Sequence, residues 1–394
     1  MPSRGNGASA TELARRPSHK DRFIIVRFYD GITRVCRDRS RASCSCACEP
    51  HARMVRAIQT GRDVVNTAHQ WQCSQDVPVP VNMTVQVVPN IQRMLPHRIR
   101  PLLQPVNDYS MAVRARNDRV SGQIRWRKGW EKCLTAVFGD EIHRLRDAQG
   151  TVTFLDIGTN IGWFSVLAAA LGVQVISIEP NAENVYLIER SLCLNKFQSR
   201  VRLHQVGAGA TNEQCAIISP AVNVGDTQLA CGDVSAAVAH WNAWKGGVWA
   251  PYVVRGVVNV RRVDDVVGDV RVDIMKVDIE GFEGGALPGW HTIFSSPGSR
   301  RMPTLVLTEF QPSVMRDNGY DPEAYFQFFI RKGYGVTAVD KLPWSSITGM
   351  EPIDLEAHSW HGRNASNFFL DKSRARMSSD LIFHRKRKGW LPSY

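Results

Sequence analysis

A glycine-containing turn between an apolar run and a helical stretch constrains the fold of this chain more than any other feature. The sequence from Phe154 to Ser165 reads FLDIGTNIGWFS, and an apolar stretch with helical spacing continues to Leu171. A short apolar run that ends at glycines and opens into a helix is typical of a strand–turn–helix unit. We expect Gly158 to take a positive φ in the turn, and Gly162 to leave room beside the backbone for a ligand.

A second apolar run follows this unit and ends at an acidic residue. Val173 to Ile178 leads into Glu179, about twenty positions past the turn, where a carboxylate accepts hydrogen bonds from ribose hydroxyls. Asp156 would lie at the carboxyl edge of the first strand, where open α/β sheets bind their ligands. The pattern therefore predicts a site for an adenosine-containing cofactor, formed by Asp156, Gly158, Asn160, Gly162, Glu179, Pro180 and Asn181.

The chemistry of the turn indicates which cofactor this is. NAD sites use G-x-G-x-x-G, because the pyrophosphate lies over a helix N-terminus that must stay electropositive. This chain reads D-x-G-x-N-x-G, with the Asp156 carboxylate where the first glycine would stand. A carboxylate repels a pyrophosphate but suits a ligand that carries an ammonium and a sulfonium. We therefore expect S-adenosylmethionine rather than NAD.

Three more carboxylates follow two later strand-like runs. The segment from Val272 to Glu283 reads VDIMKVDIEGFE and carries Asp278 and Glu280, while an apolar run from Thr304 ends at Glu309. Carboxylates at the ends of buried strands are costly without a partner, so a cluster of them is a candidate site. The alternative is that they serve as caps and as ion-pair partners of lysine or arginine.

Two further features have both a structural and a functional interpretation. Glu131 precedes a helical pattern that runs from Leu134 to Leu145, and it is either a favourable first-turn charge or a cofactor residue. A third strand, predicted from Val201 to Val206, ends at Gly207-Ala-Gly209, a glycine-rich edge at which adenine would approach the backbone. We include Glu131 and Gly207 among the cofactor-binding candidates.

The connection from Asn212 to Asp265 is long, and its apolar ends predict an inserted β-hairpin. Its middle carries Trp241, Trp244 and Trp249. These rings either form a lid over the substrate or pack the loop onto the body of the protein.

Three motifs together resemble the FkbM-type S-adenosylmethionine-dependent methyltransferase family. They are Asp156-Ile-Gly-Thr-Asn-Ile-Gly-Trp-Phe, Ile178-Glu-Pro and Lys276-Val-Asp-Ile-Glu-Gly-Phe-Glu, and the resemblance covers roughly residues 120 to 340. It implies a Rossmann-like, seven-stranded methyltransferase sheet of the α/β class, whose antiparallel last strand we place at Asn367–Leu370. It also implies methyl transfer to a hydroxyl oxygen, commonly on sugars or polyketide-like small molecules.

The expected chemistry assigns roles to the carboxylates. Asp278 is the first candidate for the base that accepts the hydroxyl proton, and it lies beside the expected cofactor; Glu280 and Glu309 are the next candidates, as base or as anchors of acceptor hydroxyls. A divalent cation held by these oxygens is the rival mechanism, and we expect no metal. Two other functions stay open: an RNA 2′-hydroxyl methyltransferase and a non-catalytic cofactor-binding module.

The sequence divides into four parts. Residues 1–56 form a basic, cysteine-containing arm that we expect to be disordered or a targeting segment. Residues 57–119 are a lead-in to which the sequence assigns no clear structure, although Val77–Pro105 has the pattern of a small hairpin or a strand. Residues 120–371 form the methyltransferase domain, and residues 372–394 a basic tail.

Charge and cysteine content bound the partners and the compartment. The formal charge of +12 over 394 residues suits anionic surroundings such as nucleic acid, phospholipid or acidic glycans, but much of the excess lies near the two ends. The resemblance favours a small-molecule or glycan acceptor over nucleic acid. No apolar run approaches the roughly 18 residues of a membrane span. Nine cysteines without a framework indicate reduced thiols in the cytoplasm or in an organelle, and Cys44-Ser-Cys46-Ala-Cys48 lacks the pair spacing of a zinc site. Nothing in the sequence indicates an oligomeric state.

Overall fold

The computed structural model describes residues 23–27, 33–37, 83–88, 108–244, 251–295, 302–339, 353–354 and 379–385. The chain divides into two compact units, Met1–Gly61 and Arg62–Tyr394. In the first unit, β1 (Phe23–Arg27) and β2 (Thr33–Arg37) pair as an antiparallel hairpin. The cysteines from Cys44 to Cys48 lie outside the described residues, and disorder or targeting of the arm stays a prediction.

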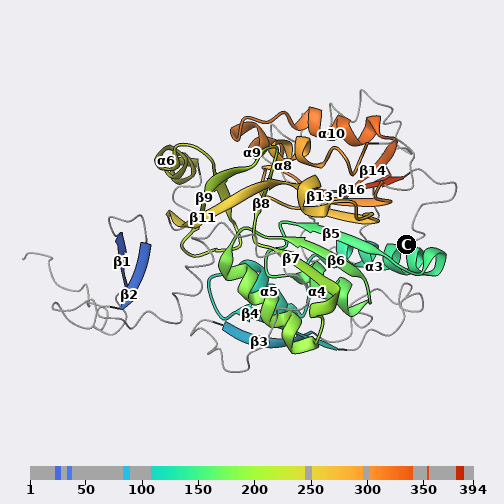
Figure 1. Ribbon diagram of the computed structural model, residues 1–394, viewed down its shortest axis with the longest axis horizontal. Coiled ribbons are helices and arrows are strands. Elements are labelled where there is room, and N and C mark those ends of the chain that lie inside the picture. The colour runs from blue at the N-terminus through green and yellow to red at the C-terminus, as the bar shows by residue number, and fades with distance from the viewer. Residues whose placement is uncertain are drawn as a thin grey trace, which may run out of the picture. The chain divides into compact units, whose positions relative to one another are not determined.

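The second unit is built on one large, mostly parallel sheet (Figure 1). Its strand order is β15-β14-β16-β13-β12-β5-β6-β7, in which β16 runs antiparallel to both of its neighbours. The strands are β5 (Thr153–Ile157), β6 (Gln174–Ile178), β7 (Val201–His204), β12 (Ile274–Val277), β13 (Leu305–Phe310), β14 (Tyr334–Val339), β15 (Ile353–Asp354) and β16 (Ser379–Arg385). Without the two-residue edge strand β15, this is the predicted seven-stranded sheet, and the fold class is confirmed.

The central strands are near-continuous apolar runs because both faces of the sheet are covered, as expected for parallel sheets. Successive residues alternate between two cores: Phe154 and Ile274 belong to one, Leu155 and Met275 to the other. Figure 1 shows α4 and α5 below the sheet and α8, α9 and α10 above it. The helices of this unit are α2 (Arg119–Arg127), α3 (Lys132–Gln149), α4 (Trp163–Ala170), α5 (Ala182–Asn195), η3 (Gln198–Arg200), α6 (Val234–Trp244), α7 (Val263–Val267), α8 (Glu283–Ala286), η4 (Leu287–Trp290), α9 (Pro312–Asp317) and α10 (Pro322–Arg331).

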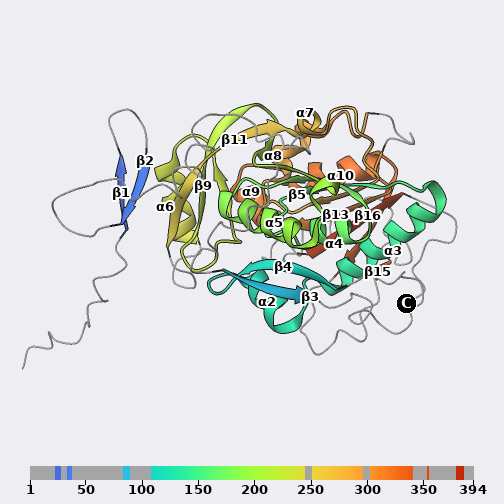
Figure 2. The same ribbon diagram turned by 60° about the horizontal axis from the view of Figure 1, so that its bottom comes forward.

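The lead-in segment supplies part of the core. β3 (Met83–Val88) pairs antiparallel with β4 (Tyr109–Arg114), as Figure 2 shows. β4 packs on α5, where the Ala112 backbone N–H donates to Ser191 Oγ at 2.9 Å. Met111 and Val113 are fully buried in the same core as α4 and α5. A domain start at residue 120 is therefore too late. The sequence did not predict β4, because its six residues show little alternation of apolar and polar positions and give a weak strand signal.

The long connection after β7 forms a second, smaller sheet. β8 (Gly207–Gly209), β9 (Glu213–Pro220), β10 (Gln228–Ala230) and β11 (Tyr252–Arg262) lie in the order β10-β9-β11-β8, and the antiparallel pair β9–β11 confirms the predicted hairpin. Trp241, on α6, is buried and packs on Tyr252 with 5.6 Å between ring centroids. For Trp241 the packing interpretation is therefore correct. The side chain of Trp244 and the whole of Trp249 lie outside the described part of the chain.

The antiparallel strand of the large sheet comes from a different segment than predicted. It is β16, whose register pairs Ile382 with Leu307 and Phe383 with both Val306 and Val336. The predicted strand, Asn367–Leu370, lies outside the described residues, and β16 falls inside the segment assigned to a basic tail. The assignment failed because only Leu381–Phe383 is apolar, between charged or titratable neighbours.

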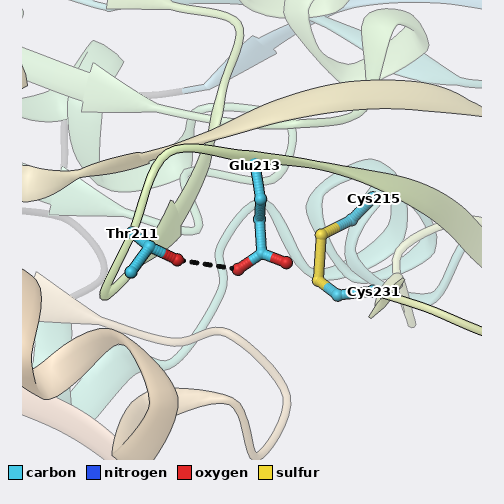
Figure 3. Close-up of a disulfide and its surroundings, with 4 residues drawn as sticks. All are labelled: Thr211, Glu213, Cys215 and Cys231. Atoms are coloured by element: carbon cyan, nitrogen blue, oxygen red, sulfur yellow. Dashed lines mark hydrogen bonds between the residues drawn. A yellow bond between two sulfur atoms is a disulfide. The ribbon is translucent and has the colours of Figure 1, made fainter.

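A disulfide joins Cys215 and Cys231 at the base of the β9–β10 hairpin, as Figure 3 shows. Cys193 is disulfide-bonded as well. The expectation of reduced thiols is therefore wrong for these cysteines. The spacing of 16 residues gave no signal, because the two residues become neighbours only through the register that pairs Ala216 with Ala230. Among the described residues, no helix combines the length and apolarity that crossing a bilayer requires.

Candidate active site

The glycine turn after β5 is held tightly against two other strands. Gly158 has φ +79° and its N–H donates to Ile178 O at 2.9 Å, which ties the turn to the end of β6. Asn160 and Gly162 also have positive φ, +54° and +90°. A Cβ on Gly158 would lie 1.8 Å from the carbonyl oxygen of Asp278. A side chain at position 158 is thus excluded, and the turn contacts the end of β12 backbone to backbone.

Glu179 lies next to this turn, as predicted. It is 3% exposed and accepts three hydrogen bonds: from Asn160 N at 2.8 Å, Asn181 N at 2.9 Å and Asn184 Nδ2 at 3.0 Å. Burial raises the pKa of Glu179 to about 7, although these donors favour the charged form. The turn and the acid expected to bind ribose therefore form one rigid unit.

Asp156 faces the core. It is 1% exposed, and Ser165 Oγ donates to its Oδ2 at 2.6 Å. Burial raises the pKa of Asp156 to about 6, while Lys276 opposes the shift from the adjacent strand, where it pairs with Asp156 in register. Its observed contacts hold β5 to α4, and a role toward a ligand stays a prediction.

Lys276 is a buried cation among carboxylates. It is 5% exposed, and its Nζ lies 2.7 Å from Asp278 Oδ2. Burial disfavours its charge, but Asp278, Glu131 and Asp156 together raise the pKa of Lys276. The ion-pair interpretation of the strand-end carboxylates is thus correct for Asp278, in addition to any role in the chemistry.

Glu131 belongs to this cluster of charges. It precedes α3 in a left-handed conformation with φ 38°, and its side chain makes no capping hydrogen bond. Burial raises the pKa of Glu131 well above its usual value, Lys276 opposes the shift, and Asp380, Asp278 and Glu309 add to it. Its Oε2 is buried without a hydrogen-bond partner among the described residues. Glu131 therefore lies toward Asp278.

Three carboxylates form a rim at the ends of β12 and β13. Asp278, Glu280 and Glu309 each offer an oxygen, and these oxygens lie within 4.8 Å of one another. Gln311 Nε2 donates to Glu309 Oε2 at 2.6 Å and to Glu280 Oε2 at 3.4 Å. This carboxylate rim offers hydrogen-bond acceptors to hydroxyl groups, and its spacing also suits a divalent cation. A second group of possible metal ligands consists of Glu213, Cys215 and Cys231. The two cysteines form a disulfide, so they offer no thiolate to a metal ion (Figure 3).

Two predicted cofactor residues have clear structural roles. Asn181 caps α5, because its Oδ1 accepts from Glu183 N at 3.0 Å. A Cβ on Gly207 would lie 2.9 Å from the side chains of both Leu229 and Val260, so packing of the smaller sheet already requires glycine there. Pro180 is half-buried between Glu179 and Asn181. Contact of these three residues with a cofactor stays a prediction.

Sequence reasoning missed three polar residues near these groups. Asp118 caps α2, Asp380 lies buried on β16, and Gln311 follows β13. The D-x-x-S spacing before α2 is a capping signal that would have located Asp118. Asp380 and Gln311 become neighbours of the rim only through strand pairing, which leaves no local signal.

Comparison with known proteins finds a matching family for part of the chain. Residues 156–336 match the family described as the methyltransferase FkbM domain. Comparison with curated proteins finds no match. Among solved structures, methyltransferase FkbM from Methylobacillus flagellatus is 18% identical with a TM-score of 0.32, and the match covers 59% of this chain and 44% of that one. This chain therefore matches less than half of that protein's length.

Two other structures are similar at the same level. The precorrin-6y C5,15-methyltransferase of Geobacter metallireducens is 13% identical with a TM-score of 0.28, over 64% of this chain and 88% of that one. The O-methyltransferase of Bacillus cereus, in complex with SAH, is 11% identical with a TM-score of 0.29, over 62% and 79%. Residues 156–336, somewhat less than half of the chain, carry a methyltransferase FkbM domain.

Proposed function

We propose that this chain is an S-adenosylmethionine-dependent O-methyltransferase whose acceptor is a hydroxyl group of a small molecule or glycan. The observation that carries the proposal is the carboxylate rim in backbone contact with the glycine turn. The match of residues 156–336 to the methyltransferase FkbM domain supports methyl transfer, and the rim supports an acceptor that donates hydrogen bonds.

The residues fit the cofactor. Glu179 is the proposed acceptor of hydrogen bonds from ribose hydroxyls, and the buried Oε2 of Glu131, which has no hydrogen-bond partner among the described residues, suits a cationic group near Asp278. When bound, S-adenosylmethionine would supply an electrophilic methyl group on its sulfonium. A carboxylate-lined site favours such a cation and disfavours a pyrophosphate.

Asp278 is the proposed base. An alcohol is a poor nucleophile near neutral pH, and it must lose its proton as a bond to carbon forms. A positioned carboxylate that accepts the proton contributes typically about 10²–10⁴-fold to the rate. The ion pair with Lys276 fixes the Asp278 carboxylate, and Gln311 orients Glu280 and Glu309, which would accept from further hydroxyls of the acceptor.

The charge of the rim supports a neutral acceptor over RNA. Three carboxylate oxygens within 4.8 Å of one another repel a phosphate brought close to the reacting hydroxyl. A sugar or polyketide-like hydroxyl brings no such charge.

The experiment replaces Asp278 by asparagine, which keeps the shape and removes the base. Asp278→Asn should bind S-adenosylhomocysteine as the wild type does and lose about 10²–10⁴-fold in methyl transfer. Asp269→Asn, the same change at an exposed position, is the matched control and should keep full activity. Wild-type activity in Asp278→Asn would remove this residue from the mechanism.

A chelation arm separates the base from the metal mechanism. We expect EDTA to leave wild-type activity unchanged. Inactivation by EDTA that magnesium or manganese reverses would assign the carboxylate rim to a divalent cation instead.

A further inference from the structure

The tip of the β9–β10 hairpin, residues 221–227, contacts elements on both sides of the cofactor turn. On one side Val224 N donates to Asn117 O, and Arg119 N donates to Asn223 Oδ1, each at 3.4 Å. On the other side Asn181 Nδ2 donates to Thr227 Oγ1 at 3.4 Å. This hairpin tip therefore bridges the start of α2 and the start of α5.

Gly225 marks the place where the hairpin tip meets the turn. A Cβ on Gly225 would lie 2.8 Å from Asp118 Oδ1 and 3.3 Å from Asn160 Nδ2. Asp118 and Asn160 come from separate elements, yet both approach the same glycine. The Asn160 backbone N–H also donates to Glu179, which connects this place to the acid predicted to bind ribose.

Two buried oxygens at this place have no hydrogen-bond partner within the described part of the chain: Asp118 Oδ1 and Asn160 Oδ1. The Asp118 carboxylate is fixed, because its Oδ2 accepts from Ser121 N at 2.7 Å. Burying an acceptor without a partner is costly, and the cost is removed when a ligand supplies the donor. Two such acceptors on converging segments point to a ligand rich in donors.

We propose that Asp118, Asn160 and the hairpin tip form the outer wall of the S-adenosylmethionine site. In this wall Asp118 Oδ1 and Asn160 Oδ1 accept hydrogen bonds from hydroxyl or ammonium groups of the cofactor, opposite Glu179. The inference rests on the proposed use of S-adenosylmethionine and adds Asp118 and the hairpin tip to the predicted cofactor site, of which Asn160 is already a part.

The disulfide keeps this wall in place. In the β9–β10 hairpin, Ala216 pairs with Ala230, and the bonded Cys215 and Cys231 are the next residues out (Figure 3). The disulfide thus closes the hairpin at the end opposite its tip. A wall that is ordered before the cofactor arrives costs less conformational entropy on binding.

The test is calorimetric titration of the full chain with S-adenosylhomocysteine. Asp118→Asn keeps a good N-cap for α2 but turns an amide N–H₂ toward the ligand in place of the acceptor oxygen. We expect affinity to fall about ten- to hundredfold, as for a lost charge-assisted hydrogen bond. Asp321→Asn makes the same change at the N-cap of α10, where Oδ1 accepts from Glu323 N, and should leave affinity unchanged.

A second pair of variants does not depend on the capping residue. Gly225→Ala places a methyl group against Asp118 Oδ1 and should weaken binding at least tenfold, whereas Gly256→Ala, with nothing within 4 Å of the new methyl, should not. Cys215→Ser combined with Cys231→Ser should weaken binding severalfold.

The outcomes separate this inference from the proposed function. Failure of the wild type to bind S-adenosylhomocysteine would overturn the proposed function itself. Tight binding by the wild type, together with affinities of Asp118→Asn and Gly225→Ala within twofold of it, would overturn the outer wall alone. If Asp118→Asn fails to fold, Gly225→Ala decides.

Discussion

At the scale of single residues, the site depends on carboxylates whose charge is adjusted by burial. Burial has the largest effect on the pKa of Glu179 and raises it to about 7. The Glu179 carboxylate also accepts hydrogen bonds from three N–H donors, which lower its pKa. The donors fix the orientation of the carboxylate, and burial brings its titration near neutral pH. We therefore expect any hydrogen bond that Glu179 accepts from a ligand to depend on pH near 7.

We predict that affinity for S-adenosylhomocysteine increases with pH through about 7, because only the ionised Glu179 carboxylate accepts both ribose donors. Glu179→Gln should abolish this dependence, and Glu179→Ala should lower affinity about ten- to hundredfold. Calorimetry at several pH values measures both effects. A flat wild-type profile, or wild-type affinity in Glu179→Ala, would contradict the assignment.

The same shift has a definite sign for stability. The folded pKa of about 7 lies above the usual 4.5, so the folded protein keeps the Glu179 proton after the unfolded chain has lost it. The buried, protonated Glu179 therefore contributes to the free energy of unfolding. This contribution is fully present below about pH 4.5 and is lost as pH rises toward about 7. Binding and stability therefore respond to Glu179 ionisation in opposite directions.

The residues predicted for the cofactor turn and the carboxylate rim were found from the order of apolar and polar positions alone. Gly158, Glu179 and Asp278 follow three parallel strands, and parallel strands end at one edge of a sheet. Glu131 and Asp118 were harder to place, because their relation to the site depends on how the segments before β5 pack. Gly207 was predicted to bind the cofactor because it is a glycine at a strand end. Packing of the smaller sheet also requires a residue without a side chain at this position, so the glycine alone does not indicate a ligand.

At the scale of elements, local signals predicted local structure. α10 begins after the cap Asp321 with Pro322 at its first turn, and both residue types are local signals for the start of a helix. β4, β16 and the disulfide were missed because each is defined by its partners: α5 for β4, β13 and β14 for β16, and the hairpin register for the cysteines.

Phe383 tests the assignment of β16. Its side chain is fully buried and stacks on Phe329 with 4.3 Å between ring centroids. Phe383→Ala should lower the free energy of unfolding by about 3–5 kcal/mol, measured by urea denaturation. Val270→Ala, at an exposed apolar position, is the control and should change it by less than about 0.5 kcal/mol. A Phe383→Ala effect as small as the control would mean that this segment is a solvated tail.

At the scale of the whole molecule, the division into two units predicts independence. Removal of residues 1–61 leaves the three hydrophobic clusters described in the second unit intact. We expect the shortened chain to keep its melting temperature and its affinity for S-adenosylhomocysteine, measured by calorimetry. Cooperative loss of folding in the shortened chain would show that the first unit is part of the same domain. Stoichiometric zinc binding by the full chain that depends on Cys44–Cys48 would show that the arm forms a metal-binding domain.

The central claim is methyl transfer to a hydroxyl of a small molecule or glycan, and the most direct measurement follows a labelled methyl group. The full chain is incubated with S-adenosylmethionine labelled in its methyl group and with fractionated extract. We predict that label enters a small-molecule or glycan fraction, survives ribonuclease, and resists mild alkali as a methyl ether does. Label lost on ribonuclease treatment, label released by alkali as from an ester, or no transfer by a chain that binds the cofactor would each contradict the account.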